Sequence, residues 1–220
     1  MTRANIQDSY RENYNQIAQD HVAYALEHDG GNPFMPPDMV ETFEAATDAL
    51  VRRHVTEGGR VLDAGCGTGS LLARLDGYER VGIDMSEDYI NYARGRSRTA
   101  DLDLVAMQIG HATATLLGRF DAVLCTDVLE HVLDEHAVLR ILHTMLKPGA
   151  VLIVRVPYAE DLSVYWPTPN SPYEYVHLRR FDMPTLGLLL EKIHGFEIME
   201  FDTVAYPGWD ELHCVAQKPG

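Results

Sequence analysis

The feature that most constrains the fold is residues 60–70, which read R-V-L-D-A-G-C-G-T-G-S. A short apolar run predicts a buried strand, and three glycines at alternate positions follow it. Leucines at positions 71, 72 and 75 then predict one face of a helix. Strand, glycine turn and helix together predict the start of a nucleotide-binding unit, in which backbone amides and the helix N-terminus approach a ligand closely.

A second apolar run, residues 81–83, ends at Asp84, nineteen residues after Gly65. An acidic residue about twenty residues after the glycine turn is placed to accept hydrogen bonds from the ribose of a bound nucleoside. The alternative is a glycine-rich turn with an unrelated solvated aspartate, and this spacing favours the ribose interpretation.

The glycine spacing differs from that of dinucleotide-binding loops. The pattern G-x-G-x-x-G would need glycine where Ser70 stands, and the carboxylate of Asp63 would repel a pyrophosphate but suit a cation. The pattern V-L-D-x-G-C-G-T-G resembles the first motif of class I S-adenosylmethionine-dependent methyltransferases. This resemblance implies S-adenosylmethionine as cofactor and S-adenosylhomocysteine as product, with Asp63, Gly65, Cys66 and Gly67 beside the positively charged methionine part.

The resemblance covers the chain from about Tyr14 to the end and implies further cofactor contacts. Residues 14–21 resemble the helix that precedes the core in many small-molecule methyltransferases, in which an aromatic residue reaches the cofactor carboxylate. Tyr14 has that place, or it only packs the helix on the core. Met85 follows the ribose acceptor and is expected on the adenine face, a place that a core methionine also satisfies.

The adenine site departs from the family pattern. The resemblance places a Gly-Asp-Ala turn after the third strand, where the carboxylate binds the adenine amino group, but this chain reads Gly110-His111-Ala112. A neutral imidazole nitrogen of His111 can accept the same hydrogen bond. Alternatively, only the backbone of Ala112 is used and His111 is exposed.

The block D-V-L-E-H-V at residues 127–132 resembles the fourth motif of the same family. It follows an apolar run, residues 120–126, so Thr126 and Asp127 are expected at the carboxyl end of a strand, facing the methyl-transfer centre. His131 is a candidate general base, and a structural or cofactor-side role is the alternative.

Residues 157–180 are rich in aromatic residues and proline, and no regular period fits them. A loop this long is usually functional, which predicts a substrate lid; an aromatic packing loop is the alternative. His177 lies in an H-x-x-x-F element that resembles one in ubiquinone-biosynthesis-type and sugar-cluster methyltransferases. It is a second candidate base, with Tyr158 as an orienting group. Metal-ligand spacing is missing among the histidines and cysteines, so no metal is expected.

Two apolar segments near the C-terminus, residues 196–204 and 212–216, are joined by a short turn and must pair antiparallel. We therefore expect one α/β domain with a Rossmann-like, seven-stranded, mostly parallel sheet, an antiparallel last strand and helices on both faces. The expected parts are an N-terminal helical lid (1–57), a cofactor-binding core (58–156), a substrate-lid loop (157–182) and a C-terminal helix and hairpin (183–220).

The amino-acid composition indicates which kinds of partner this protein can bind. The net charge of −15 argues against a surface for nucleic acid or anionic membranes. Neither a signal peptide nor an apolar run of membrane-spanning length is recognised, and three dispersed cysteines fit a reduced, cytoplasmic protein. We expect a small-molecule acceptor and a monomer or homodimer.

Three functions remain open from the sequence. The first is methyl transfer to an oxygen or nitrogen of a small metabolite. The second is RNA or protein methylation, which a basic groove or an N/D-P-P-Y-type tetrapeptide would favour; residues 126–129, T-D-V-L, are not one. The third is a regulatory protein that binds S-adenosylmethionine without catalysis.

Overall fold

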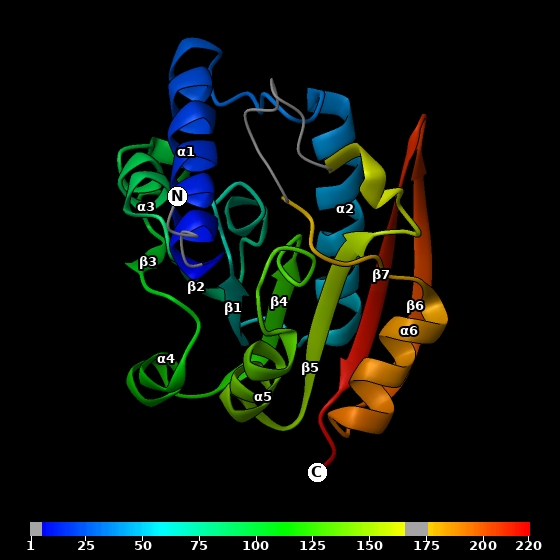
Figure 1. Cartoon of the computed structure of the whole chain (residues 1–220). Helices are drawn as coiled ribbons and strands as arrows, with labels where there is room; N and C mark the ends of the chain where they lie inside the picture. The colour runs from blue at the N-terminus through cyan, green and yellow to red at the C-terminus, as the bar shows by residue number, and fades with distance from the viewer. Residues whose placement is uncertain (1–5, 166–175) are drawn as a thin grey trace.

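The computed structural model describes residues 6–165 and 176–220 and contains one twisted sheet with helices on both faces (Figure 1). The strand order is β3-β2-β1-β4-β5-β7-β6. The neighbouring pairs from β3 to β5 are parallel, and β7 runs antiparallel to both β5 and β6. This confirms the predicted fold class. The strand bounds are β1 Arg60–Ala64, β2 Glu79–Asp84, β3 Asp103–Ala106, β4 Phe120–Thr126, β5 Leu146–Pro157, β6 Glu197–Tyr206 and β7 Trp209–Gln217.

Both faces of the sheet are buried because side chains alternate along each strand. In β1, Val61 and Leu62 are both fully buried but belong to different hydrophobic clusters. Helices α2 and α3 cover one face, α5 and α6 cover the other, and α1 packs against α3. The helix bounds are α1 Ile6–Glu27, α2 Pro37–His54, α3 Glu87–Arg94, α4 His111–Leu117, α5 Glu135–Met145 and α6 Met183–Gly187, which continues as a π-helical segment, Leu188–Ile193.

Capping residues fix where two of these helices begin. The hydroxyl of Ser86 accepts a hydrogen bond from the Tyr89 amide at 3.4 Å, so α3 starts at Glu87. The carboxylate of Asp134 accepts one from the Ala137 amide at 2.8 Å and places the start of α5 at Glu135.

The helix expected directly after the glycine turn is not present. Only a short 3-10 helix, Leu72–Arg74, forms, because the chain turns at Gly77 and enters β2 at Glu79. The leucines of this segment are buried in the cluster below α2 and α3, so their spacing reflects packing rather than an α-helix. The prediction of a helix N-terminus facing the ligand is therefore wrong.

The third strand ends at Ala106, four residues before the Gly110-His111-Ala112 turn. Ala106 pairs with Asp84, the last residue of β2, and the Met107 amide donates a last hydrogen bond to the Asp84 carbonyl at 2.7 Å. The chain then leaves the sheet before Gly110 and α4. No helix in the described parts of the chain has the length and apolar character needed to cross a membrane.

Candidate active site

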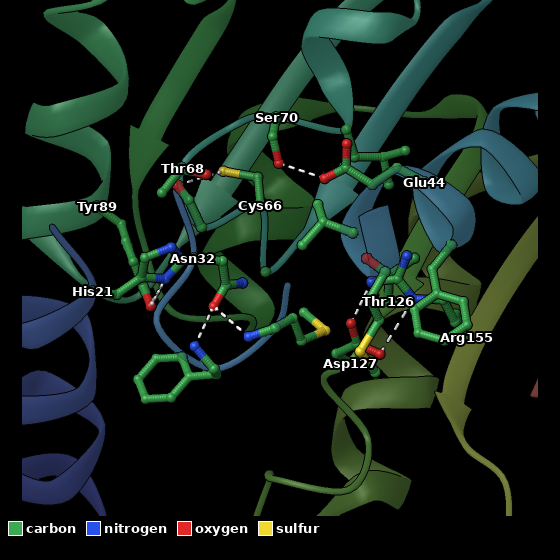
Figure 2. A pocket seen from close by; sticks show the side chains of 18 of the residues that line it. His21, Asn32, Glu44, Cys66, Thr68, Ser70, Tyr89, Thr126, Asp127 and Arg155 are labelled. Atoms are coloured by element: carbon green, nitrogen blue, oxygen red, sulfur yellow. Dashed lines mark hydrogen bonds and ion pairs between the residues drawn. The ribbon is translucent and has the colours of Figure 1, made fainter. Parts of the chain in front are cut away.

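A pocket of about 770 Å³ lies over the carboxyl ends of β1 and β4. These two strands are where the strand order reverses, which is the position at which open α/β sheets bind ligands. Helices α1 and α2 and the segment between them form one wall, and residues after β4 and β5 form the other. Figure 2 shows side chains from both walls facing a common space.

The glycine turn forms the floor of this pocket, and two of its glycines have different structural roles. Gly65 has a φ of +99°, and a Cβ placed on it would lie 2.4 Å from Cγ2 of Val128. Gly67 has a φ of +50°, and a Cβ there would meet nothing within 4 Å. Gly65 is thus required for packing against the segment after β4, whereas Gly67 leaves its backbone open to the pocket.

Asp63 lines the pocket and lacks a full set of partners. It is 2% exposed, and its Oδ1 accepts no hydrogen bond from any described residue. Burial raises the pKa of Asp63 from an ordinary 3.8 to about 7, a rise that the positive charge of Arg155 opposes. An unpaired buried carboxylate facing a pocket is suited to a positively charged ligand.

Asp84 lies just behind the glycine turn. Its carboxylate accepts hydrogen bonds from the amides of Gly67 at 3.0 Å and Ser86 at 2.8 Å. The Tyr14 hydroxyl donates a longer one at 3.5 Å, so α1 reaches this carboxylate from above. Burial raises the pKa of Asp84 despite these donors. The structure therefore brings Tyr14, Asp84 and the glycine turn together.

The residues predicted to contact adenine are Met85, His111 and Ala112. Met85 is half-buried, while His111 and Ala112 are exposed in the first turn of α4. None of the three lines the pocket as it stands. The physical reason is that β3 ends early and the chain turns away from the sheet before Gly110. A role for these residues at adenine stays a prediction.

The opposite end of the pocket is built around an ion pair after β4 and on β5. Asp127 has a φ of +53° and pairs with Arg155, whose Nε lies 3.3 Å from Oδ1, with a second contact from Nη2 to Oδ2 (Figure 2). Burial alone would lower the pKa of Arg155, but the charge and hydrogen bond of Asp127 together with the charges of Glu211 and Glu44 raise that pKa. Thr126, 8% exposed, lies next to the pair on the pocket wall.

The structure brings the two candidate bases together, although they are far apart in the sequence. The centroids of the His131 and His177 rings are 4.6 Å apart. Nδ1 of His131 donates to the Val176 carbonyl at 2.8 Å, and Nδ1 of His177 lies 2.7 Å from a carboxylate oxygen of Glu160. Burial, followed by the nearby charge of His177, lowers the pKa of His131 to about 4.

Sequence reasoning did not identify the acidic groups of this end as site residues. Glu130 is fully buried, neither of its carboxylate oxygens has a hydrogen-bond partner among the described residues, and its pKa is raised well above the ordinary value, first by burial and then by Asp127. Glu130 stands inside the D-V-L-E-H-V block, and this position could have identified it as a site residue from the sequence. Other pocket residues that sequence reasoning missed are Glu44, Arg155, Trp209 and Glu211. Of these, only Arg155 could have been recognised from the sequence, because it is the one charged residue in an apolar run.

Tyr158 is not brought to the pocket with the two histidines. Its amide donates to the Asp210 carbonyl at 2.9 Å, and it pairs with Phe181 in an isolated bridge. Tyr158 lines a second hollow instead, which shares Pro157, Val164 and Trp209 with the pocket. Tyr165 has the aromatic place beside His177, with ring centroids 4.4 Å apart. Part of the predicted substrate lid, residues 166–175, lies outside the described residues.

Comparison with known proteins identifies a protein family and curated relatives that match this chain. A family model described as a methyltransferase domain matches residues 55–177. The ubiquinone biosynthesis O-methyltransferase of Xanthomonas campestris pv. campestris (strain B100) is 36% identical over 126 residues, covering 53% of this chain and 52% of the relative. The chain thus aligns with about half of the length of the curated relatives it matches.

Solved structures share the fold over most of the chain. A magnesium protoporphyrin IX methyltransferase from Synechocystis PCC 6803, solved with bound SAM, has a TM-score of 0.71 at 21% identity and covers 99% of both chains. A 1,6-didemethyltoxoflavin-N1-methyltransferase from Burkholderia thailandensis has a TM-score of 0.65 at 23% identity, covering 94% of this chain and 89% of its own.

Proposed function

This chain belongs to the methyltransferase domain family, and on that premise we propose that it transfers a methyl group from S-adenosylmethionine to an oxygen or nitrogen of a small metabolite. The observation that carries the proposal is that a single pocket joins the glycine turn and the unpaired Asp63 carboxylate to the acidic and aromatic groups beyond β4 and β5. Cofactor and acceptor sites are thus adjacent.

The cofactor end fits S-adenosylmethionine through the charges and shape of this chain's own residues. When bound, the cofactor supplies a methyl group on a cationic sulfur, which the attacking acceptor atom displaces. Asp63 offers an unpaired carboxylate oxygen for the positive charges of its methionine part. Gly67 leaves room for close approach, and Asp84 offers a carboxylate for the ribose hydroxyls once Tyr14 moves off it or shares it.

The acceptor end supplies proximity, orientation and a place for a proton. Methyl transfer depends mainly on alignment, because the methyl group is already activated. A hydroxyl or amine acceptor must also lose a proton, and Glu160 holds Nδ1 of His177 so that Nε2 is the nitrogen left with a free lone pair. His177 is therefore the better oriented of the predicted bases, while His131 has a pKa of about 4 and is a weaker one.

The side chains that line the acceptor end of the pocket indicate what kind of acceptor molecule it binds. Carboxyl groups of Glu130 and Glu211 line it together with the rings of Tyr165 and Trp209. Such a wall favours a neutral or cationic acceptor with an aromatic or otherwise apolar part. The net charge of −15 supports the exclusion of nucleic acid as acceptor. A monomer or homodimer and a cytoplasmic location remain predictions.

Calorimetric titration with S-adenosylmethionine, S-adenosylhomocysteine and NAD in parallel tests the cofactor. Micromolar binding of the first two and none of NAD is the expected result; binding of NAD, or of none, would contradict the proposal. Turnover is then followed as S-adenosylhomocysteine release with a panel of phenols, other alcohols and amines. Affinity for the cofactor without turnover on any acceptor would instead indicate a regulatory binding protein.

A further inference from the structure

Three metal-ligating side chains converge at the acceptor end of the pocket. Glu130, His131 and His177 each present a ligand atom, and these atoms all lie within 4.8 Å of one another. Nε2 of His131 is 4.0 Å from Oε1 of Glu130. All three residues line the pocket, and the Glu130 side chain is fully buried.

The hydrogen bonds behind the two imidazoles fix which nitrogen is free. Nδ1 of His131 contacts the Val176 carbonyl and Nδ1 of His177 contacts the Glu160 carboxylate, and both partners accept but do not donate. Each Nδ1 therefore carries the hydrogen, and each Nε2 keeps its lone pair. Ligating histidines typically have this support, in which a carbonyl or carboxylate holds the other ring nitrogen.

Glu130 is a second and independent observation. It is fully buried, lines the pocket, and has no hydrogen-bond partner on either carboxylate oxygen among the described residues. An isolated buried carboxylate is costly unless a cation or donors compensate it. The acidic groups of Asp127, Glu160 and Glu211 act on Glu130, and of these Asp127 is itself paired with Arg155.

We propose that Glu130, His131 and His177 bind one divalent transition-metal ion at the acceptor end of the pocket. Two imidazoles with one carboxylate favour zinc, iron or cobalt over magnesium or calcium, which prefer oxygen ligands. Ligands about 2.1 Å from a tetrahedral ion lie roughly 3.4 Å apart, so the cluster has to contract by about an ångström. Three protein ligands leave a position open on the ion. The inference replaces the expectation of no metal, which came from spacing along the sequence and could not see this convergence.

What the ion does rests on the proposed function. An acceptor hydroxyl bound at the open position becomes more acidic, as metal-bound water does. It releases its proton to solvent, its oxygen forms a bond to the methyl carbon, and the carbon–sulfur bond breaks with the electron pair passing to sulfur. The products are a methyl ether, a neutral thioether and one proton. In this arrangement Nε2 of His177 is a ligand rather than a base, and the acceptor atom is oxygen.

Co²⁺ titration of the purified, chelator-treated full chain tests the binding, read from visible absorption and from calorimetry. We expect one Co²⁺ per chain and displacement by Zn²⁺. Glu130→Gln and His177→Gln should each weaken binding at least about tenfold, and Glu160→Gln about 10- to 100-fold through loss of second-layer support. Glu130→Gln keeps the side-chain shape, and circular dichroism confirms that each variant is folded.

The matched control is His136→Ala, because Nδ1 of His136 lies 3.1 Å from Nε2 of His194 in a histidine pair outside the pocket. This variant should bind Co²⁺ like the wild type. Binding that is absent, or that is lost in His136→Ala but kept in Glu130→Gln, would overturn the inference. Titration of the same preparations with S-adenosylhomocysteine separates the two proposals, since Co²⁺ binding needs no cofactor and cofactor binding needs no ion.

Discussion

Replacing Gly65 with alanine should destabilise the protein through two separable effects. The first is backbone strain, because alanine at a φ of +99° costs about 1–3 kcal/mol. The second is overpacking, because the new Cβ would lie 2.4 Å from Cγ2 of Val128, and forcing a methyl group into a packed site costs about 1–3 kcal/mol. The sum, about 2–6 kcal/mol, corresponds to a Tm lower by roughly 5–20 °C for a domain of this size.

Thermal unfolding of four variants separates these effects. Gly58 has a φ of +81° and open space around its missing Cβ, so Gly58→Ala reports strain alone. Val128→Ala removes the clashing methyl groups, and the double variant with Gly65→Ala should recover about 1–3 kcal/mol relative to the sum of the single changes. The reasoning is refuted if Gly65→Ala costs no more than Gly58→Ala, or if Val128→Ala brings no recovery.

Three further predictions concern the cofactor end. Gly67→Ala should cost only about 1–2 kcal/mol of stability, because its Cβ would point into open space, but should weaken S-adenosylhomocysteine binding measured by calorimetry. Asp84→Ala should weaken that binding by about 1–3 kcal/mol, whereas exposed Asp88→Ala should leave it unchanged; equal affinities would disprove the ribose contact. The folded protein holds the Asp63 proton up to about pH 7 and the unfolded chain only to about pH 4, so this group's contribution to stability falls as pH rises between them. Urea unfolding at pH 5.5 and 8 should show the stability of Asp63→Asn relative to the wild type rising with pH, with weaker cofactor binding in the variant; a relative stability that is the same at both pH values would argue against a raised pKa.

The local elements of the cofactor end were largely predictable from the sequence. Val61 and Leu62 indicate a strand buried on both faces, Ser86 indicates the start of a helix, and the joined last two strands require an antiparallel pair. Each of these signals acts over a few residues, through alternation of side chains, capping or turn length. Local chemistry of this kind is preserved in almost any tertiary context.

The errors show where such signals fail. Leu71, Leu72 and Leu75 have helical spacing, yet the chain between β1 and β2 forms only a 3-10 turn, because these side chains satisfy a packing requirement that a loop meets equally well. His111 is different: it lies exposed on α4 and outside the pocket, so its contact with adenine stays a prediction.

The sequence by itself determined the glycine turn, the acidic residue at the end of β2 and the antiparallel pairing of the last two strands, because these depend on neighbours along the chain. Only the tertiary structure decided that Glu130, His131 and His177 meet at one end of a pocket and that Glu160 orients His177. The segment after β4 meets the segment that follows β5, since these two strands are adjacent and parallel in the sheet. Contacts of that kind depend on strand order and sheet twist, which no local pattern records.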